Sequence, residues 1–371
     1  MVVIIGGGYD LDYEKLDKDR NTATAVKGNA LYVMDAENGN LLLAVGANTA
    51  ATTGAPNRLI NSNMKYSVAG RVKTLDRDAD GLADHIYFND LGGQVFRVDL
   101  QNALGAATSE FGHRVTRLAN LTAAHGAGSP GPRFYEAPAV TIHDEENQRF
   151  AVVSVASGDR SSPLDVDVQN RVYAIVDRDV TKASLYTSNY TADSTNITLT
   201  GLTDAAASGH ASTSILSADG DWKSAGWYRV LDEYTNKAGT TKTNQKGLKA
   251  FNELAAIRND LYVSVYNPHE TADSNPCSAQ VLGASELHRY CLPFGVCAKL
   301  PSNRQRYLLG QGIQAVNFGP GNDDQSRRII YPTPNPEKKE QGEGTLEYKA
   351  PPSLMPIRWY EKQPKLPAAK E

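Results

Sequence analysis

One short stretch of this 371-residue sequence has the residue types and spacing of a metal-binding loop. Residues 76–84 read DRDADGLAD, which has the form D-x-D-x-D-G-x-x-D. Calcium is a hard cation that takes about six to eight oxygen ligands, and carboxylates two residues apart in a tight loop point to one centre. Gly81, at the sixth position, permits the sharp turn that such a loop needs. The candidate ligands are the carboxylates of Asp76, Asp78, Asp80 and Asp84 and the backbone carbonyl of Leu82.

The loop differs from an EF-hand. An EF-hand has a chelating Glu at the twelfth position, where this sequence has Tyr87, and the pattern that follows is that of a strand and not of a helix. Asp84 must therefore bind the ion directly, or a residue from elsewhere must complete the ligand shell. Magnesium and a metal-free acidic turn are the alternatives. Four carboxylates this close together repel each other, which favours calcium.

Motifs for catalysis are incomplete. The glycines at 6–8 follow an apolar run, but Leu11 stands where a dinucleotide-binding fingerprint has its third glycine. No zinc-protease spacing, nucleophile elbow or Walker motif is present. We therefore expect a protein that is not an enzyme, with no catalytic residue and with calcium as its cofactor. A second ion near Asp159, Asp165 and Asp167 stays an open question, and a role in holding a loop is favoured for residues 158–160.

Three cysteines lie within 21 residues, at Cys277, Cys291 and Cys297. No histidine pair with zinc-site spacing is nearby. Their clustering favours one disulfide in an oxidising compartment, with free buried thiols and a zinc site as the alternatives. The pairing is not determined by the sequence.

The composition excludes several classes of protein. Lys and Arg number 38 against 42 Asp and Glu, a net charge of −4, so no general basic field exists to bind nucleic acid. No apolar run reaches the roughly 20 residues of a membrane helix. The opening MVVIIG is too short for a signal peptide and reads as a strand. We expect the chain to be cut from a longer protein, with Met1 added and any export signal outside it.

The elements that must position the loop are predicted to be mainly strands. Short β-branched and aromatic runs are separated by Gly, Asn, Asp and Pro. The predicted strands include 2–5, 31–34, 85–88, 95–98, 150–155, 172–176, 261–266 and 287–290. The stretch 248–257 fits either a helix or a strand. Residues 181–221 read as an insertion.

A degenerate repeat runs through these strands. Each copy is an apolar strand that ends in Gly or Asp, then a loop, then a strand centred on an aromatic residue. The copies are IIGGGYD with NALYVMDAENG, IYFND with GGQVFRVDLQN, VVSVASGDR with NRVYAIVDRD and, more weakly, YVSVYNP with SELHRYCLPFG. The aromatic residues are Tyr32, Phe96, Tyr173 and Tyr290. Repeated small antiparallel units predict an all-β fold of the β-propeller type.

Several of these motifs together resemble the C-terminal domain of PilY-type type IV pilus biogenesis factors. They are the strand-GGGYD opening, the DRDADGLAD loop that runs into YFNDLGGQVFRVDL, the later SGDRSSPLDVDVQNRVYAI, and GWYRVL. The resemblance covers roughly residues 2–330. It implies a modified, quinoprotein-like β-propeller of about seven blades with long inserted loops. It also implies that Asp76, Asp78, Asp80, the Leu82 carbonyl and Asp84 match the family's calcium positions.

The resemblance implies a function outside the cell. Calcium occupancy would regulate pilus extension against retraction, and so twitching motility and surface attachment. The implied location is the pilus tip, the cell surface, or the outer membrane and periplasm of a Gram-negative bacterium. The implied partners are minor pilins, the outer-membrane secretin, a host or abiotic surface, and an N-terminal module of the same protein. The Arg-Gly-Asp motif of some family members is absent.

Two other functions fit the same sequence. One is a quinoprotein-like dehydrogenase on the propeller scaffold, and the other is a calcium-stabilised adhesin without a switch. For the domain organisation, we expect a propeller at 2–331, which includes the loop 76–84, and an extended or flexible C-terminal segment at 332–371.

Overall fold

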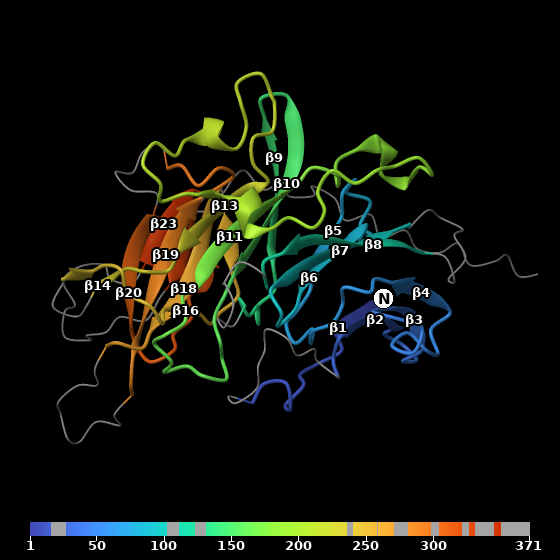
Figure 1. Ribbon diagram of the computed structural model, residues 1–371, viewed down its shortest axis with the longest axis horizontal. Coiled ribbons are helices and arrows are strands. Elements are labelled where there is room, and N and C mark those ends of the chain that lie inside the picture. The colour runs from blue at the N-terminus through green and yellow to red at the C-terminus, as the bar shows by residue number, and fades with distance from the viewer. Residues whose placement is uncertain are drawn as a thin grey trace, which may run out of the picture.

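The computed structural model shows a chain whose regular elements are almost all strands (Figure 1). The residues that it describes are 1–15, 27–101, 111–122, 131–235, 240–257, 259–270, 281–297, 304–320, 326–330 and 345–349. Three short 3-10 helices, Ala183–Tyr186, Leu199–Gly201 and Ser212–Ser214, lie in the described chain between residues 177 and 226. The predicted all-β class is confirmed. In the described residues, no helix has the length and apolar character to span a membrane.

The first two sheets have four strands each. The first runs in the order β1 (Val2–Gly6), β2 (Ala30–Asp35), β3 (Leu41–Gly46) and β4 (Asn57–Ile60). Its strands pair antiparallel, except that β4 is parallel to β3. The second sheet is an antiparallel meander of β5 (Lys73–Leu75), β6 (His85–Asn89), β7 (Gln94–Leu100) and β8 (Gly112–Asn120).

The next two sheets have five strands each. The third sheet has the order β12 (Thr203–Asp204), β13 (Gly226–Val230), β11 (Arg171–Asp177), β10 (Gln148–Ala156) and β9 (Ala139–Glu145). The fourth has the order β16 (Lys249–Ala250), β18 (Asp260–Asn267), β19 (Ala284–Cys291) and β20 (Arg304–Gln311), and β17 (Ala255–Ile257) also pairs with β18.

Two smaller sheets complete the described structure. One consists of β14 (Tyr234–Thr235) and β15 (Thr241–Lys242), and the other of β21 (Asn317–Pro320), β22 (Ser326–Ile330) and β23 (Thr345–Lys349). Because β23 pairs with β22, this last sheet crosses the expected domain boundary at residue 331. The remainder of the segment 332–371 lies outside the described residues.

Successive sheets pack against each other, so that the central strands are buried on both faces. On β6, Ile86 and Phe88 pack with the first sheet, whereas Tyr87 between them packs with third-sheet residues such as Val153. Val152 belongs to the next core, between the third and fourth sheets. This alternation follows the two-residue period of a strand. Consecutive sheets that share cores in this way are arranged like the blades of a propeller.

The repeat in the sequence corresponds to pairs of adjacent strands. Its four copies form the antiparallel pairs β1–β2, β6–β7, β10–β11 and β18–β19. All eight predicted strands are present, and the ambiguous stretch 248–257 forms the short strands β16 and β17. The described residues form five sheets of three or more strands, whereas about seven blades are expected. The segment 181–221 leads from β11 to β13 and contains β12.

Candidate metal centre

The acidic loop is the connection between β5 and β6. Asp76 directly follows Leu75, the last residue of β5, and Asp84 directly precedes His85, the first residue of β6. The amide of Asp84 donates to the carbonyl of Leu75 at 2.9 Å, and the amide of Leu100 on β7 donates to the carbonyl of Asp84 at 2.8 Å. The base of the loop is therefore fixed to a buried sheet, while the tip is exposed.

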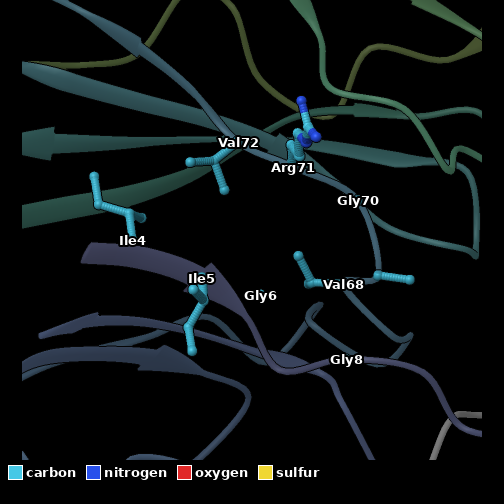
Figure 2. Close-up of a pocket in the computed structure, with 9 residues that line it drawn as sticks. Ile4, Ile5, Gly6, Gly8, Val68, Gly70, Arg71 and Val72 are labelled. Atoms are coloured by element: carbon cyan, nitrogen blue, oxygen red, sulfur yellow. The ribbon is translucent and has the colours of Figure 1, made fainter. Parts of the chain in front are cut away.

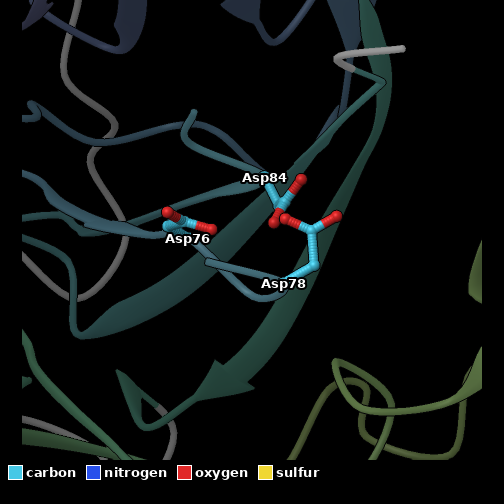
Figure 3. Close-up of side chains that lie close together, drawn as sticks. All are labelled: Asp76, Asp78 and Asp84. Atoms are coloured by element: carbon cyan, nitrogen blue, oxygen red, sulfur yellow. The ribbon is translucent and has the colours of Figure 1, made fainter. Parts of the chain in front are cut away.

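Three carboxylates converge in this loop (Figure 3). One oxygen from each of Asp76, Asp78 and Asp84 lies within 4.8 Å of the others. Asp76 and Asp78 are exposed, whereas Asp84 is only 8% exposed. Negative charges at this separation repel, and a cation between them would remove that repulsion. The donors are hard carboxylate oxygens, so the group fits calcium or magnesium better than a metal that prefers thiolates.

Backbone amides hold these carboxylates in place. Asp76 accepts hydrogen bonds from the amides of Ala79 at 2.7 Å and Gly81 at 2.9 Å. Asp84 Oδ2 accepts one from the amide of Arg77 at 2.6 Å. Gly81 has a φ of 90°, in the region that favours glycine. The prediction that a glycine permits the sharp turn at this position is confirmed. An ionised carboxylate has about four acceptor positions, so each keeps capacity for a cation.

The structure brings together part of the predicted ligand set. Asp76, Asp78 and Asp84 form the group, and Asp80 does not belong to it. Asp80 Oδ1 instead accepts a hydrogen bond from the amide of Leu82 at 2.8 Å. Ligation by Asp80 and by the Leu82 carbonyl therefore stays a prediction.

A fully buried charge network lies beneath the loop. His85 Nδ1 is 2.9 Å from Asp99 Oδ1, and Arg97 Nε donates to the same oxygen at 2.7 Å. An Arg97 Nη donates to both oxygens of Asp177 on β11, at 2.5 and 2.6 Å, and the Tyr87 hydroxyl donates to Asp177 at 3.0 Å. Burial opposes ionisation of Asp99, but His85 and Arg97 outweigh it and hold its pKa below the ordinary value.

We did not predict this network from the sequence. A signal for it exists in the pairing of β6 with β7, where His85 lies opposite Asp99 and Tyr87 lies opposite Arg97. Polar residues at alternate positions of two apolar strands share one face of the sheet. Their partner Asp177 is 80 residues from Arg97 in sequence, so the local pattern does not reveal it.

The other acidic residues considered as ligands do not form a second group. Among the described residues, the loop 76–84 holds the only set of three acidic, histidine or cysteine side chains close enough to share a metal. Asp159 and Asp165 each accept a hydrogen bond from the amide two residues further on, at 2.9 and 2.8 Å. Arg160 donates to the carbonyl of Phe251 at 2.6 Å. These contacts hold loops in place, the role favoured for residues 158–160.

The glycine-rich stretch 6–8 borders a largely apolar pocket (Figure 2). This pocket of about 440 Å³ lies between β1 and the segment 68–72, and Arg71 is the only charged residue that lines it. A Cβ on Gly6 would lie 2.2 Å from the carbonyl oxygen of Val68, so this glycine allows two backbone segments to approach closely. The carboxylate of Asp10 accepts bonds from nearby amides and holds the turn.

The cysteines form one disulfide in the described residues, between Cys291 and Cys297, whose Cα atoms are 5.3 Å apart. The bond closes the short loop after β19. The sequence favoured a disulfide but left its pairing undetermined. Cys277 lies outside the described residues.

No family model and no curated protein matches this chain. Among solved structures, the chain is similar to the Pseudomonas aeruginosa PilY1 C-terminal domain, with a TM-score of 0.55 and 16% sequence identity. That alignment covers 94% of this chain and 69% of the PilY1 chain. A Synechocystis apocarotenoid oxygenase mutant aligns with a TM-score of only 0.22 and 10% identity, over 72% of this chain and 57% of that one, which supports no argument. The predicted resemblance to PilY-type proteins is thus confirmed in the fold, and the chain has the fold of the PilY1 C-terminal domain.

Proposed function

We propose that this chain is a calcium-binding domain of a type IV pilus protein and that it is not an enzyme. The observation that carries the proposal is the convergence of Asp76, Asp78 and Asp84 in one loop of a PilY1-like fold. A bound calcium ion would neutralise the repulsion between these carboxylates. Asp84 holds the base of the loop against the buried sheet, so the occupancy of the loop would affect the edge of that sheet.

In this proposal the protein is exported and acts at the pilus tip, the cell surface or the outer membrane. Calcium occupancy controls pilus extension against retraction, and hence twitching motility and surface attachment. Its partners are minor pilins, the outer-membrane secretin, a host or abiotic surface, and an N-terminal module of the same protein. An ion that binds only the folded form stabilises it by about 2.7 kcal/mol at a concentration 100 times its Kd. Such an energy is enough to order a loop at an interface.

The proposal is tested first by calorimetric titration of calcium into chelator-stripped protein. We expect one-site binding that is lost in Asp84→Ala and kept in Asp144→Ala, because Asp144 is an exposed carboxylate that is paired with Arg149 and does not belong to the converging group. The same substitutions in the full-length protein then report on function in bacteria. If Asp84→Ala abolishes binding but leaves piliation and twitching at wild-type levels, the switch is contradicted.

Two other functions have separate tests. A calcium-stabilised adhesin without a switch predicts tight, permanent binding, whereas a switch predicts a Kd within the micromolar to millimolar range. A quinoprotein-like dehydrogenase predicts a change in absorbance and dye reduction when pyrroloquinoline quinone is added. We expect no change in absorbance and no dye reduction, because the sequence has no adjacent pair of cysteines that could cap a quinone.

A further inference from the structure

A segment that follows β11 covers one side of the acidic loop 76–84, which we call the metal loop. We call residues 179–194, which follow β11, the capping segment. Its two ends are joined, because the carboxylate of Asp179 accepts hydrogen bonds from the amides of Asp193 at 3.0 Å and Ser194 at 2.7 Å. Lys182 adds an ion pair to Asp179 at 3.1 Å and another to Asp193. The capping segment is therefore a closed unit, and its middle is the 3-10 helix Ala183–Tyr186.

Tyr186 in this segment contacts both ends of the metal loop. At the start of the loop, the Arg77 guanidinium carbon lies 5.2 Å from the centre of the Tyr186 ring. At the end of the loop, the ring of His85 stacks on Tyr186, with centroids 6.4 Å apart and planes inclined by 22°. The Tyr186 hydroxyl donates to the carbonyl of Leu100 at 2.9 Å, and the amide of Leu100 donates to Asp84.

Arg77 links the candidate ligands to the capping segment through two different groups. Its backbone amide donates to the carboxylate of Asp84 at 2.6 Å. Its guanidinium donates to the carbonyl of Val180 at 3.4 Å, in addition to its contact with Tyr186. Arg77 thus contacts a candidate ligand through its backbone and the capping segment through its side chain.

We propose that the capping segment senses the occupancy of the metal loop. The inference rests on the proposed calcium site, and it names the segment that responds to the occupancy of that site. With calcium bound, the loop ends are held together and Tyr186 is seated between Arg77 and His85. Without it, repulsion among the carboxylates opens the loop, the seat is lost, and the capping segment loosens. The order of the segment then differs between the two states.

The test is amide hydrogen exchange followed by mass spectrometry on peptides that span residues 178–196, with calcium and with chelator. In the wild type we expect calcium to slow exchange in this segment by about tenfold, a common size for coupling between sites. Peptides from β18 and β19 of the fourth sheet should exchange equally in both states. Calorimetry on the same samples reports calcium binding independently.

Tyr186→Leu removes the ring and should make exchange in the capping segment insensitive to calcium. Because coupling is reciprocal, this variant should also bind calcium more weakly. The loss in affinity should equal the factor by which calcium slows exchange in the wild type. Tyr186→Phe keeps the ring, and Arg71→Ala removes an exposed arginine elsewhere. Both should behave like the wild type, apart from the lost hydroxyl contact in Tyr186→Phe.

The outcomes separate the two proposals. If the wild-type protein binds calcium and exchange in the capping segment is unchanged, the inference is overturned and the calcium site stands. If the wild-type protein does not bind calcium, the proposed function fails, and the inference fails with it. The wild-type comparison decides both points even if Tyr186→Leu does not fold.

Discussion

Arg97 on β7 and Asp177 on β11 form an ion pair between two neighbouring sheets, with an Nη of Arg97 2.5 Å from Asp177 Oδ1 and both side chains fully buried. Each of these two charged side chains also has a second hydrogen-bond partner. Arg97 also binds Asp99, and Asp177 also accepts from the Tyr87 hydroxyl. Buried charges are tolerated when hydrogen bonds satisfy them, as they are here, and the network ties the sheet of the metal loop to the sheet of the capping segment.

Asp177→Ala should destabilise the fold strongly. The substitution leaves the Arg97 guanidinium buried without one of its carboxylates, and loss of one partner of a buried pair typically costs about 3–5 kcal/mol. Chemical denaturation gives the change in the free energy of unfolding. Asp144→Ala is the matched control, because its pair with Arg149 is exposed and its loss should leave the denaturation midpoint unchanged. Equal effects of the two substitutions would show that the buried network contributes nothing.

The individual carboxylates of the loop should contribute unequally to calcium binding. Asp78 belongs to the converging group, whereas Asp80 is engaged by the amide of Leu82. We expect Asp78→Asn to weaken calcium binding more than Asp80→Asn does, by about tenfold or more in Kd, since loss of a direct ligand removes a charge from the ion's shell. Calorimetry on both variants measures this. Equal losses would show that calcium draws Asp80 into the ligand shell.

The disulfide should stabilise the fold modestly. Cys291 and Cys297 are six residues apart, and closing so short a loop restricts the unfolded chain by only about 2 kcal/mol. The double substitution of both cysteines by serine should lower the free energy of unfolding by about this amount. Reduction should lower the wild-type value equally and leave the variant unaffected. Thiol labelling in denaturant checks the pairing, and it should leave Cys291 and Cys297 unlabelled until the protein is reduced.

Much of the fold could be predicted because the strands are buried on both faces. Apart from Ser154, the runs 150–155 and 172–176 consist of apolar and aromatic residues, and a strand between two shared cores favours this pattern. The parallel pairing of β4 with β3, and of β12 with β13, could not be predicted. The residues of β4, Asn57–Ile60, have no strong strand pattern, so it is their position beside β3 that makes them a strand.

The convergence of Asp76, Asp78 and Asp84 could be predicted because the three carboxylates lie within nine residues and the turn between them is set by local bonds. The carboxylate of Asp76, for example, is fixed by the amides of Ala79 and Gly81. The role of Tyr186 could not be predicted, because it reaches Arg77 from a segment about a hundred residues away. Only the packing of the second sheet against the third brings them together.

His143 should make stability fall as the pH drops below 6.5. Its ring is buried against Phe150 on β10, and its Nε2 lies 2.8 Å from the Thr141 hydroxyl. Burial lowers the pKa of His143 from 6.5 to about 4. The folded protein therefore favours the neutral ring. Between pH 6.5 and pH 4 the unfolded chain takes up a proton that the folded chain does not, so folding loses up to about 3 kcal/mol across this window.

The contribution of His143 is isolated by His143→Gln, which cannot titrate. The difference in the free energy of unfolding between wild type and variant should be constant above pH 6.5 and should shrink or reverse as the pH approaches 4, because only the wild type carries the penalty. Protonation of Asp99, whose pKa is lowered, destabilises the fold only at lower pH. Because Asp99 is present in both the wild type and the variant, its effect cancels in the difference. A difference that stays constant from pH 7 to pH 4.5 would contradict the prediction. An NMR titration of the His143 ring that finds an ordinary pKa would do so independently.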